Sequence, residues 1–208
     1  MRMLILACLT ALAVPQGAAQ DQVVQLAQTD RDAGVKYLEE TRAKFLASID
    51  GLSDAQWTFK AGPDRWSIAE TAEHIAVSEG IILQLVTDRI MKAPKVPADP
   101  ARATDAKVIE VITDRSGKAQ APEMLKPTNR WPTRAALTQE FEVARKRTID
   151  YVRTTQDDLR GHAMAHPVMQ TIDGYQWVLL LAAHSARHTA QIEEVKTAAG
   201  YPKGNAAN

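Results

Sequence analysis

Two histidines within one apolar helical stripe constrain the fold of this chain more than any other feature. His184 and His188 are four residues apart in a helix predicted between Tyr175 and Val195, and this spacing places both side chains on one face. The same face carries the apolar residues Trp177, Leu181, Ile192 and Val195. Cβ atoms at this spacing are roughly 6 Å apart, so both rings can converge on one ion. The pair therefore predicts a buried metal site that needs a third ligand.

Few other imidazoles are available as that ligand. The sequence contains only His74, His162 and His166 besides the pair. His74 falls in a second predicted helix, and the residues around it at helical spacing form an inward-facing stripe: Thr71, Val77, Ser78, Ile81 and Leu85. His162 and His166 fall in a loop between predicted helices.

The residues between the paired histidines disfavour one common metal site. They are Ser185, Ala186 and Arg187, so the glutamate that follows the first histidine in a zinc protease helix is absent. The spacing alone is also compatible with histidines that bind no metal, in a core or on a surface. The pattern by itself leaves these interpretations open.

Four amphipathic segments predict an all-α fold. Apolar residues recur at spacings of three, four and seven from Val35 to Leu52, from Ile68 to Ile90, from Leu137 to Thr155 and along the histidine helix. Side chains that can cap helix starts precede them, among them Ser67 with Glu70 and Asp173 with Gln176. No segment alternates long enough to predict a strand. The sequence predicts a four-helix bundle with one long crossover between its second and third helices.

That crossover is the segment 93–132, which contains six of the ten prolines. It shows little continuous periodicity, apart from a short helical pattern near Ala103 to Ile112. Connections of this length often have a function.

The N-terminus has the pattern of a secretory signal. Met1-Arg2-Met3 precedes an apolar run from Leu4 to Val14, which is too short to span a bilayer. Gly17-Ala18-Ala19 provides a small-x-small cleavage site. We expect residues 1–19 to be a signal peptide, residues 20–208 to be one domain, and the protein to be exported, either to the periplasm or out of the cell. The alternative is an N-terminal helix that anchors the chain or stays cytosolic.

Composition excludes several classes of function. The only cysteine is Cys8, within the predicted signal, so the mature chain would have neither a disulfide nor a cysteine nucleophile. The 208 residues carry 25 basic and 25 acidic side chains, and loss of Arg2 leaves 24 against 25. A neutral chain without a basic cluster gives no reason to expect a nucleic-acid partner. The mature chain has no sequence signal for membrane association.

Several motifs together resemble the DinB-like superfamily, over residues 32–200. The motifs are Asp64-Arg65-Trp66-Ser67-Ile68 followed by His74, then His166-Pro167, Trp177, and His184-x-x-Arg187-His188-x-x-Gln191-Ile192. The resemblance implies a four-helix bundle with a triad of metal-binding histidines, one from the second helix and two from the fourth. By motif position, these are His74, His184 and His188.

Three neutral imidazoles with open coordination positions suit Zn²⁺, Ni²⁺ or Fe²⁺, and we take zinc as the default. Water bound to such an ion has its pKa lowered to about 7 and becomes a nucleophile at neutral pH. The resemblance implies hydrolysis or thiol-dependent transfer or isomerisation. The expected export favours hydrolysis, because the low-molecular-weight thiols of relatives are abundant in the cytosol.

Two further side chains are candidate catalytic residues. Glu70 lies one turn before His74 and is a candidate general base, although its capping role is favoured. Gln191 lies on the histidine stripe and is a candidate to bond a ligand or the substrate, with a core contact as an equal alternative. Arg187 lies off that stripe, so a structural ion pair with a carboxylate is favoured.

The hypotheses for function fall into three classes. The first is an exported metalloenzyme acting on an unidentified small molecule. The second is a non-catalytic metal-binding or ligand-binding bundle, which a fourth protein ligand would favour. The third is a helical adaptor without metal. The sequence leaves open whether the chain is a monomer or a homodimer.

Overall fold

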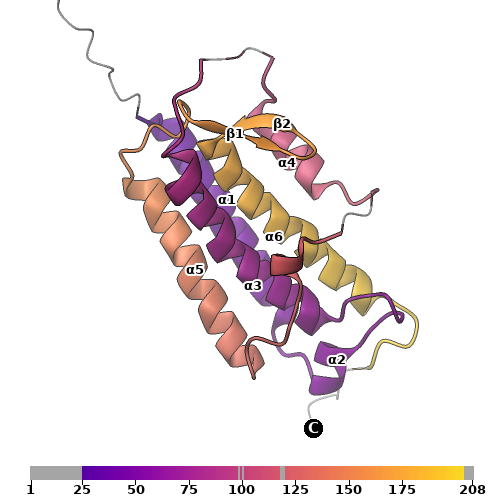
Figure 1. Cartoon of the computed structure of the whole chain (residues 1–208). Coiled ribbons are helices and arrows are strands. Elements are labelled where there is room, and N and C mark those ends of the chain that lie inside the picture. The colour runs from indigo at the N-terminus through magenta and orange to yellow at the C-terminus, as the bar shows by residue number, and fades with distance from the viewer. Residues whose placement is uncertain (1–24, 98, 100, 118–119, 204–208) are drawn as a thin grey trace, which may run out of the picture.

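Long helices packed side by side form the body of the protein (Figure 1). The structure is a computed structural model that describes residues 25–97, 99, 101–117 and 120–203. The expected signal peptide lies outside these residues. No helix within these ranges is both long and apolar enough to cross a bilayer. The predicted four-helix bundle is confirmed, and its helices are α1 (Gln28–Ile49), α3 (Ile68–Leu85), α5 (Arg134–Thr154) and α6 (Gly174–Lys196).

The order of the helices around the bundle differs from their order in the chain. Helices α1 and α3 each pack against both α5 and α6. Arg134 at the start of α5 donates to the Leu52 carbonyl just beyond α1 at 2.6 Å, and Arg31 near the start of α1 donates to the Thr155 carbonyl at the end of α5 at 3.2 Å. These contacts make α1 and α5 antiparallel. The neighbours α3 and α5 run in the same direction (Figure 1), which requires the long crossover between them.

The crossover and the other connections contain short elements, and the predicted short helix within the crossover is confirmed. After α3 the chain makes a π-helical turn, η1, then forms α4, which packs against α6, and the 3-10 turn η2. A further short helix, α2, lies between α1 and α3. Their bounds are α2 Asp54–Thr58, η1 Val86–Ile90, α4 Asp105–Thr113 and η2 Glu123–Leu125.

The helix starts agree with the predicted caps. Ser67 accepts the Glu70 N–H while the Glu70 side chain accepts the Ser67 N–H, and Asp173 and Gln176 form the same reciprocal pair. Each pair satisfies backbone donors that the first helical turn leaves free. The capping residues therefore fix where α3 and α6 begin. Ser67 lies seven residues before His74, and Asp173 lies eleven residues before His184.

A hairpin before α6 was not expected from the sequence. Strands β1 (Ala163–His166) and β2 (Gln170–Asp173) pair antiparallel, with Ala163 opposite Asp173. The prediction of an uninterrupted loop here was wrong, because strands of four residues are too short to show an alternating pattern. The hairpin leads directly into α6.

A polar layer divides the core of the bundle into two hydrophobic clusters. One cluster includes Leu38, Ile149 and Leu181, and the other includes Phe45 and Ile192. Between them lies Arg145, whose side chain is fully buried. Its guanidinium donates to groups from all three other helices: Glu79 on α3, the Leu38 carbonyl and Thr41 on α1, and Ser185 on α6. One side chain therefore links the four helices at a fixed height.

Replacement of Arg145 by methionine is expected to lower the free energy of unfolding by about 3–5 kcal/mol, because Glu79 would keep a buried charge without its partner. The double variant R145M/E79L removes that charge as well and should recover most of the loss. Urea unfolding of the three proteins measures both effects. A double variant as unstable as the single one would show that lost packing, rather than the unpaired charge, causes the destabilisation.

Candidate metal centre

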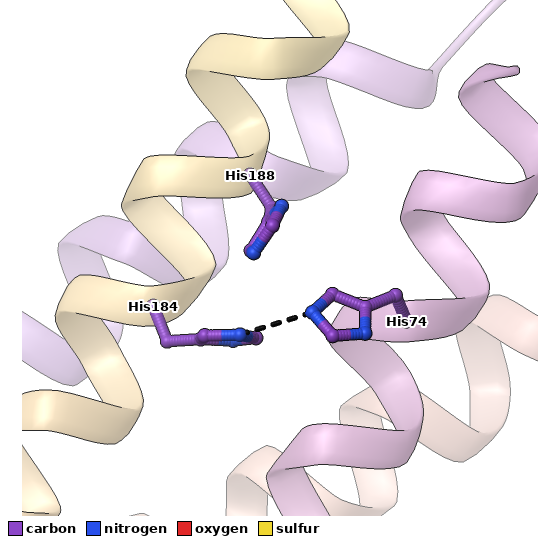
Figure 2. Close-up of side chains that lie close together, drawn as sticks. All are labelled: His74, His184 and His188. Carbon is purple, nitrogen blue, oxygen red and sulfur yellow. Dashed lines mark hydrogen bonds between the residues drawn. The ribbon is translucent and has the colours of Figure 1, made fainter. Parts of the chain in front are cut away.

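The three predicted histidines meet in the structure. His74 projects from α3, and His184 and His188 project from neighbouring turns of α6 toward it (Figure 2). One ring nitrogen from each lies within 4.8 Å of the other two, and the Nε2 atoms of His74 and His184 are 3.0 Å apart. Zinc–nitrogen bonds are about 2.0–2.1 Å long, so small rotations of the rings would bring all three nitrogens onto one ion.

The polar layer explains why α3 and α6 present these rings at the same height. Ser185 follows His184 in α6, and its hydroxyl donates to Glu79 of α3 at 2.9 Å. Glu79 lies five residues after His74. Because the two helices are joined beside the rings, His74 faces the turn between His184 and His188.

Hydrogen bonds orient two of the rings. Nδ1 of His74 is 2.8 Å from the Leu125 carbonyl oxygen in η2, and Nδ1 of His188 is 2.9 Å from Oε1 of Gln191. Both oxygens can only accept, so both Nδ1 atoms carry the proton and both Nε2 atoms keep a lone pair. This is the tautomer that a metal ligand requires at Nε2.

Burial keeps the three imidazoles neutral. Burial lowers the pKa of His74 below its usual value. The pKa of His184 is well below the usual value because of burial and the neighbouring rings of His188 and His74. Burial and the His74 ring lower the pKa of His188 to about 3. Neutral imidazoles bind divalent ions without first releasing a proton.

The site remains partly open to solvent. His74 is 2% exposed, whereas His184 and His188 are only partly buried. Within the described part of the chain, no carboxylate and no fourth histidine joins the group. Structural zinc sites have four protein ligands, and catalytic sites have three with one open position. The donor set therefore matches a site with an open coordination position.

Gln191 and Glu70 have different relations to this centre. Gln191 holds the His188 ring, as described above, and Nη1 of Arg115 lies 3.5 Å from the same amide oxygen. Glu70 uses one carboxylate oxygen for the Ser67 N–H and the other for Lys60, at 2.7 Å. The capping role favoured for Glu70 is thus confirmed. Direct catalytic roles for either residue stay predictions.

Arg187 has a structural role, but it bonds to backbone carbonyls and not to the carboxylate that was expected. Its guanidinium donates to the backbone carbonyls of Ile112, Asp114 and Gly117, instead of pairing with a carboxylate. These bonds attach the crossover to α6 at the level of the triad.

The remaining candidates lie around the centre or away from it. Nδ1 of His162 donates to the Ala93 carbonyl at 2.7 Å, and the ring of His166 packs against Trp177 with centroids 5.3 Å apart. Neither histidine joins the triad. The centroid of the Trp66 ring lies 5.0 Å from that of the His74 ring.

The sequence did not identify two groups that support the site. One is the Leu125 carbonyl, because a backbone contact across 51 residues leaves no sequence pattern. The other is Glu73, a nearly buried carboxylate that binds the segment after η2. A glutamate in an amphipathic helix is normally expected to face solvent, so no sequence pattern distinguished Glu73 from the exposed acidic residues.

The fold and the site together define a class of protein: a four-helix bundle whose second and fourth long helices present three histidines to one point. Residues 37–192 match the DinB superfamily, and the chain belongs to this superfamily.

Two of the known proteins that resemble the chain come from Bacillus subtilis. The uncharacterised protein YuaE of Bacillus subtilis is 26% identical over 157 residues, which are 76% of this chain and 93% of YuaE. The solved structure of YfiT from Bacillus subtilis, described as a probable metal-dependent hydrolase with an unusual four-helix bundle topology, superposes with a TM-score of 0.56 at 15% identity. That match covers 90% of this chain and 97% of YfiT.

The lowered histidine pKa values predict acid sensitivity of the metal-free protein. Below about pH 6.5 the histidines of the unfolded chain take up protons that the folded chain resists, so the free energy of unfolding falls as the pH falls. Each such histidine contributes at most about 1.4 kcal/mol per pH unit. Chemical unfolding between about pH 6.5 and 4 should give a shallower decline for His188→Gln than for the wild type. Equal slopes would contradict the lowered pKa of His188.

Proposed function

We propose that this protein is a metal-dependent enzyme in which His74, His184 and His188 bind one divalent ion, and that the reaction is a hydrolysis. The observation that carries the proposal is the convergence of three imidazole nitrogens in a partly solvent-open site. Two of the three rings are already fixed in the tautomer that suits a metal ligand.

The donor set fits a divalent metal of intermediate softness. Neutral imidazole nitrogens suit Zn²⁺, Ni²⁺ and Fe²⁺, and zinc is the default for a site with three nitrogen ligands. An ion in such a site supplies Lewis acidity, which polarises a substrate heteroatom or lowers the pKa of a coordinated water to about 7. The lowered pKa values of the ligands keep the donor set available at neutral pH.

The chain's own residues hold this centre in shape. Leu125 and Gln191 each fix one ring through its Nδ1 proton. The Trp66 ring packs against the His74 ring at a tilt, with the centroids 5.0 Å apart. A small-molecule substrate would enter on the side of α6, where His184 and His188 keep their partial exposure.

Hydrolysis is preferred over thiol-dependent transfer for two reasons. The similar protein YfiT is described as a probable metal-dependent hydrolase. The N-terminal sequence also favours export, which would separate the protein from the thiol pool of the cytosol.

Metal-loaded wild-type protein is expected to hydrolyse at least one compound in a panel of esters, amides and phosphoesters. Dialysis against a chelator should abolish this activity, zinc should restore it, and His184→Ala should stay inactive with zinc added. The protein should be tested in parallel for conjugation of an electrophile to a low-molecular-weight thiol. Metal-dependent conjugation without any hydrolysis would contradict the proposed reaction and favour the transferase alternative.

Export of the protein is part of the proposal. The pattern of residues 1–19 predicts cleavage after Ala19. Full-length protein expressed in a bacterium should be recovered outside the cytoplasm with Gln20 as its first residue, as N-terminal sequencing would show. Recovery in the cytoplasm with Met1 retained would contradict export.

A further inference from the structure

The carboxylate of Glu73 binds a loop rather than another helix. Glu73 precedes His74 in α3, and its side chain is only 7% exposed. One oxygen accepts the N–H of Thr128 at 2.8 Å and that of Arg130 at 3.2 Å, and the other accepts the N–H of Asn129 at 2.8 Å. Three consecutive backbone donors therefore converge on one buried charge. Charge-assisted bonds of this kind are stronger than neutral ones.

The same loop is closed by the side chain of Arg130. Its Nη1 donates to Glu73 and to the Lys126 carbonyl, both at 3.1 Å, and its Nη2 donates to the Met124 carbonyl at 3.1 Å. Asn129 has a φ of 60°, which lets the chain turn so that three successive N–H groups face one point. Glu73 and Arg130 together hold residues 124–130 as one unit, which we call the Glu73 loop.

The Glu73 loop also makes a hydrogen bond to one of the three histidines of the metal site. Leu125 lies between the two carbonyls that Arg130 binds, and its own carbonyl accepts the Nδ1 proton of His74 at 2.8 Å. This is the only hydrogen bond that the described residues make to Nδ1 of His74. The carboxylate of Glu73 thus connects to the neighbouring imidazole through the backbone of the loop.

We propose that Glu73 is a positioning residue for the metal centre: by fixing the Glu73 loop, it places the Leu125 carbonyl that sets the tautomer and the orientation of His74. The proposal rests on the proposed metal-binding function of the triad. Groups that orient a metal ligand in this way typically contribute about 10-fold to 100-fold to metal affinity or activity. A role in stability alone would leave the His74 tautomer unchanged.

The first test compares metal-free wild-type protein with Glu73→Gln. The substitution keeps the size of the side chain, but it replaces one acceptor oxygen with a donor that faces backbone N–H groups. Ring ¹⁵N chemical shifts should report the Nδ1–H tautomer of His74 in the wild type and a mixture of tautomers in the variant. An unchanged tautomer in a folded variant would overturn the proposal.

The second test measures metal affinity by zinc competition with a chromophoric chelator. Glu73→Gln is expected to weaken zinc binding about 10-fold or more, and the absorption spectrum of its Co²⁺ form should change. Asn129→Gly is the matched control, because glycine keeps the N–H and tolerates the positive φ. It should stay within about twofold of the wild type. An equal loss in Asn129→Gly would contradict a specific role for Glu73.

A third variant covers the case in which Glu73→Gln fails to fold. Arg130→Met changes a partly exposed side chain of the same loop, and we expect it to shift the tautomer and the zinc affinity in the same direction. Unchanged values for this variant would overturn the proposal. If the wild type binds no zinc, the proposed function fails, whereas the tautomer comparison still decides the role of Glu73.

Discussion

The bond network around Arg145 is the interaction on which the rest of the structure depends. A buried guanidinium is tolerated only where its donors are satisfied, and the partners of Arg145 come from α1, α3 and α6. Sliding any one helix would leave a charge or a polar group unpaired. The network therefore sets the relative heights of the helices. Since Ser185 is adjacent to His184 and Glu79 lies five residues after His74, the network also sets the height at which the metal ligands meet.

The second organising feature is the crossover. Helices α3 and α5 are parallel neighbours (Figure 1), so the chain must return along the length of the bundle between them. It does so across the side where α3 and α6 present their histidines. Arg187 ties one part of the crossover to α6, and Glu73 ties another part to α3. The crossover that the parallel helices require therefore also contains Leu125, whose backbone carbonyl orients His74.

Much of this arrangement could be predicted from the sequence, because it depends on local patterns. Apolar periodicity gave the four helices, capping residues such as Ser67 and Asp173 gave two of their starts, and motif positions gave the triad. What could not be predicted depends on distant partners. From the sequence alone, Arg145 and Glu73 are both expected to be charged residues exposed to solvent. Their burial depends on partners far away in the chain, which are Glu79 for Arg145 and the backbone of residues 128–130 for Glu73. The hairpin before α6 was too short to show its period.

The central claim is that three histidines make one metal site, and the metal content of the protein tests it most directly. Protein purified from its native host, without added metal, should contain close to one equivalent of a single divalent metal by elemental analysis. His184→Ala, purified in the same way, should contain almost none. A wild type without stoichiometric metal, or a variant that retains the full equivalent, would contradict the account.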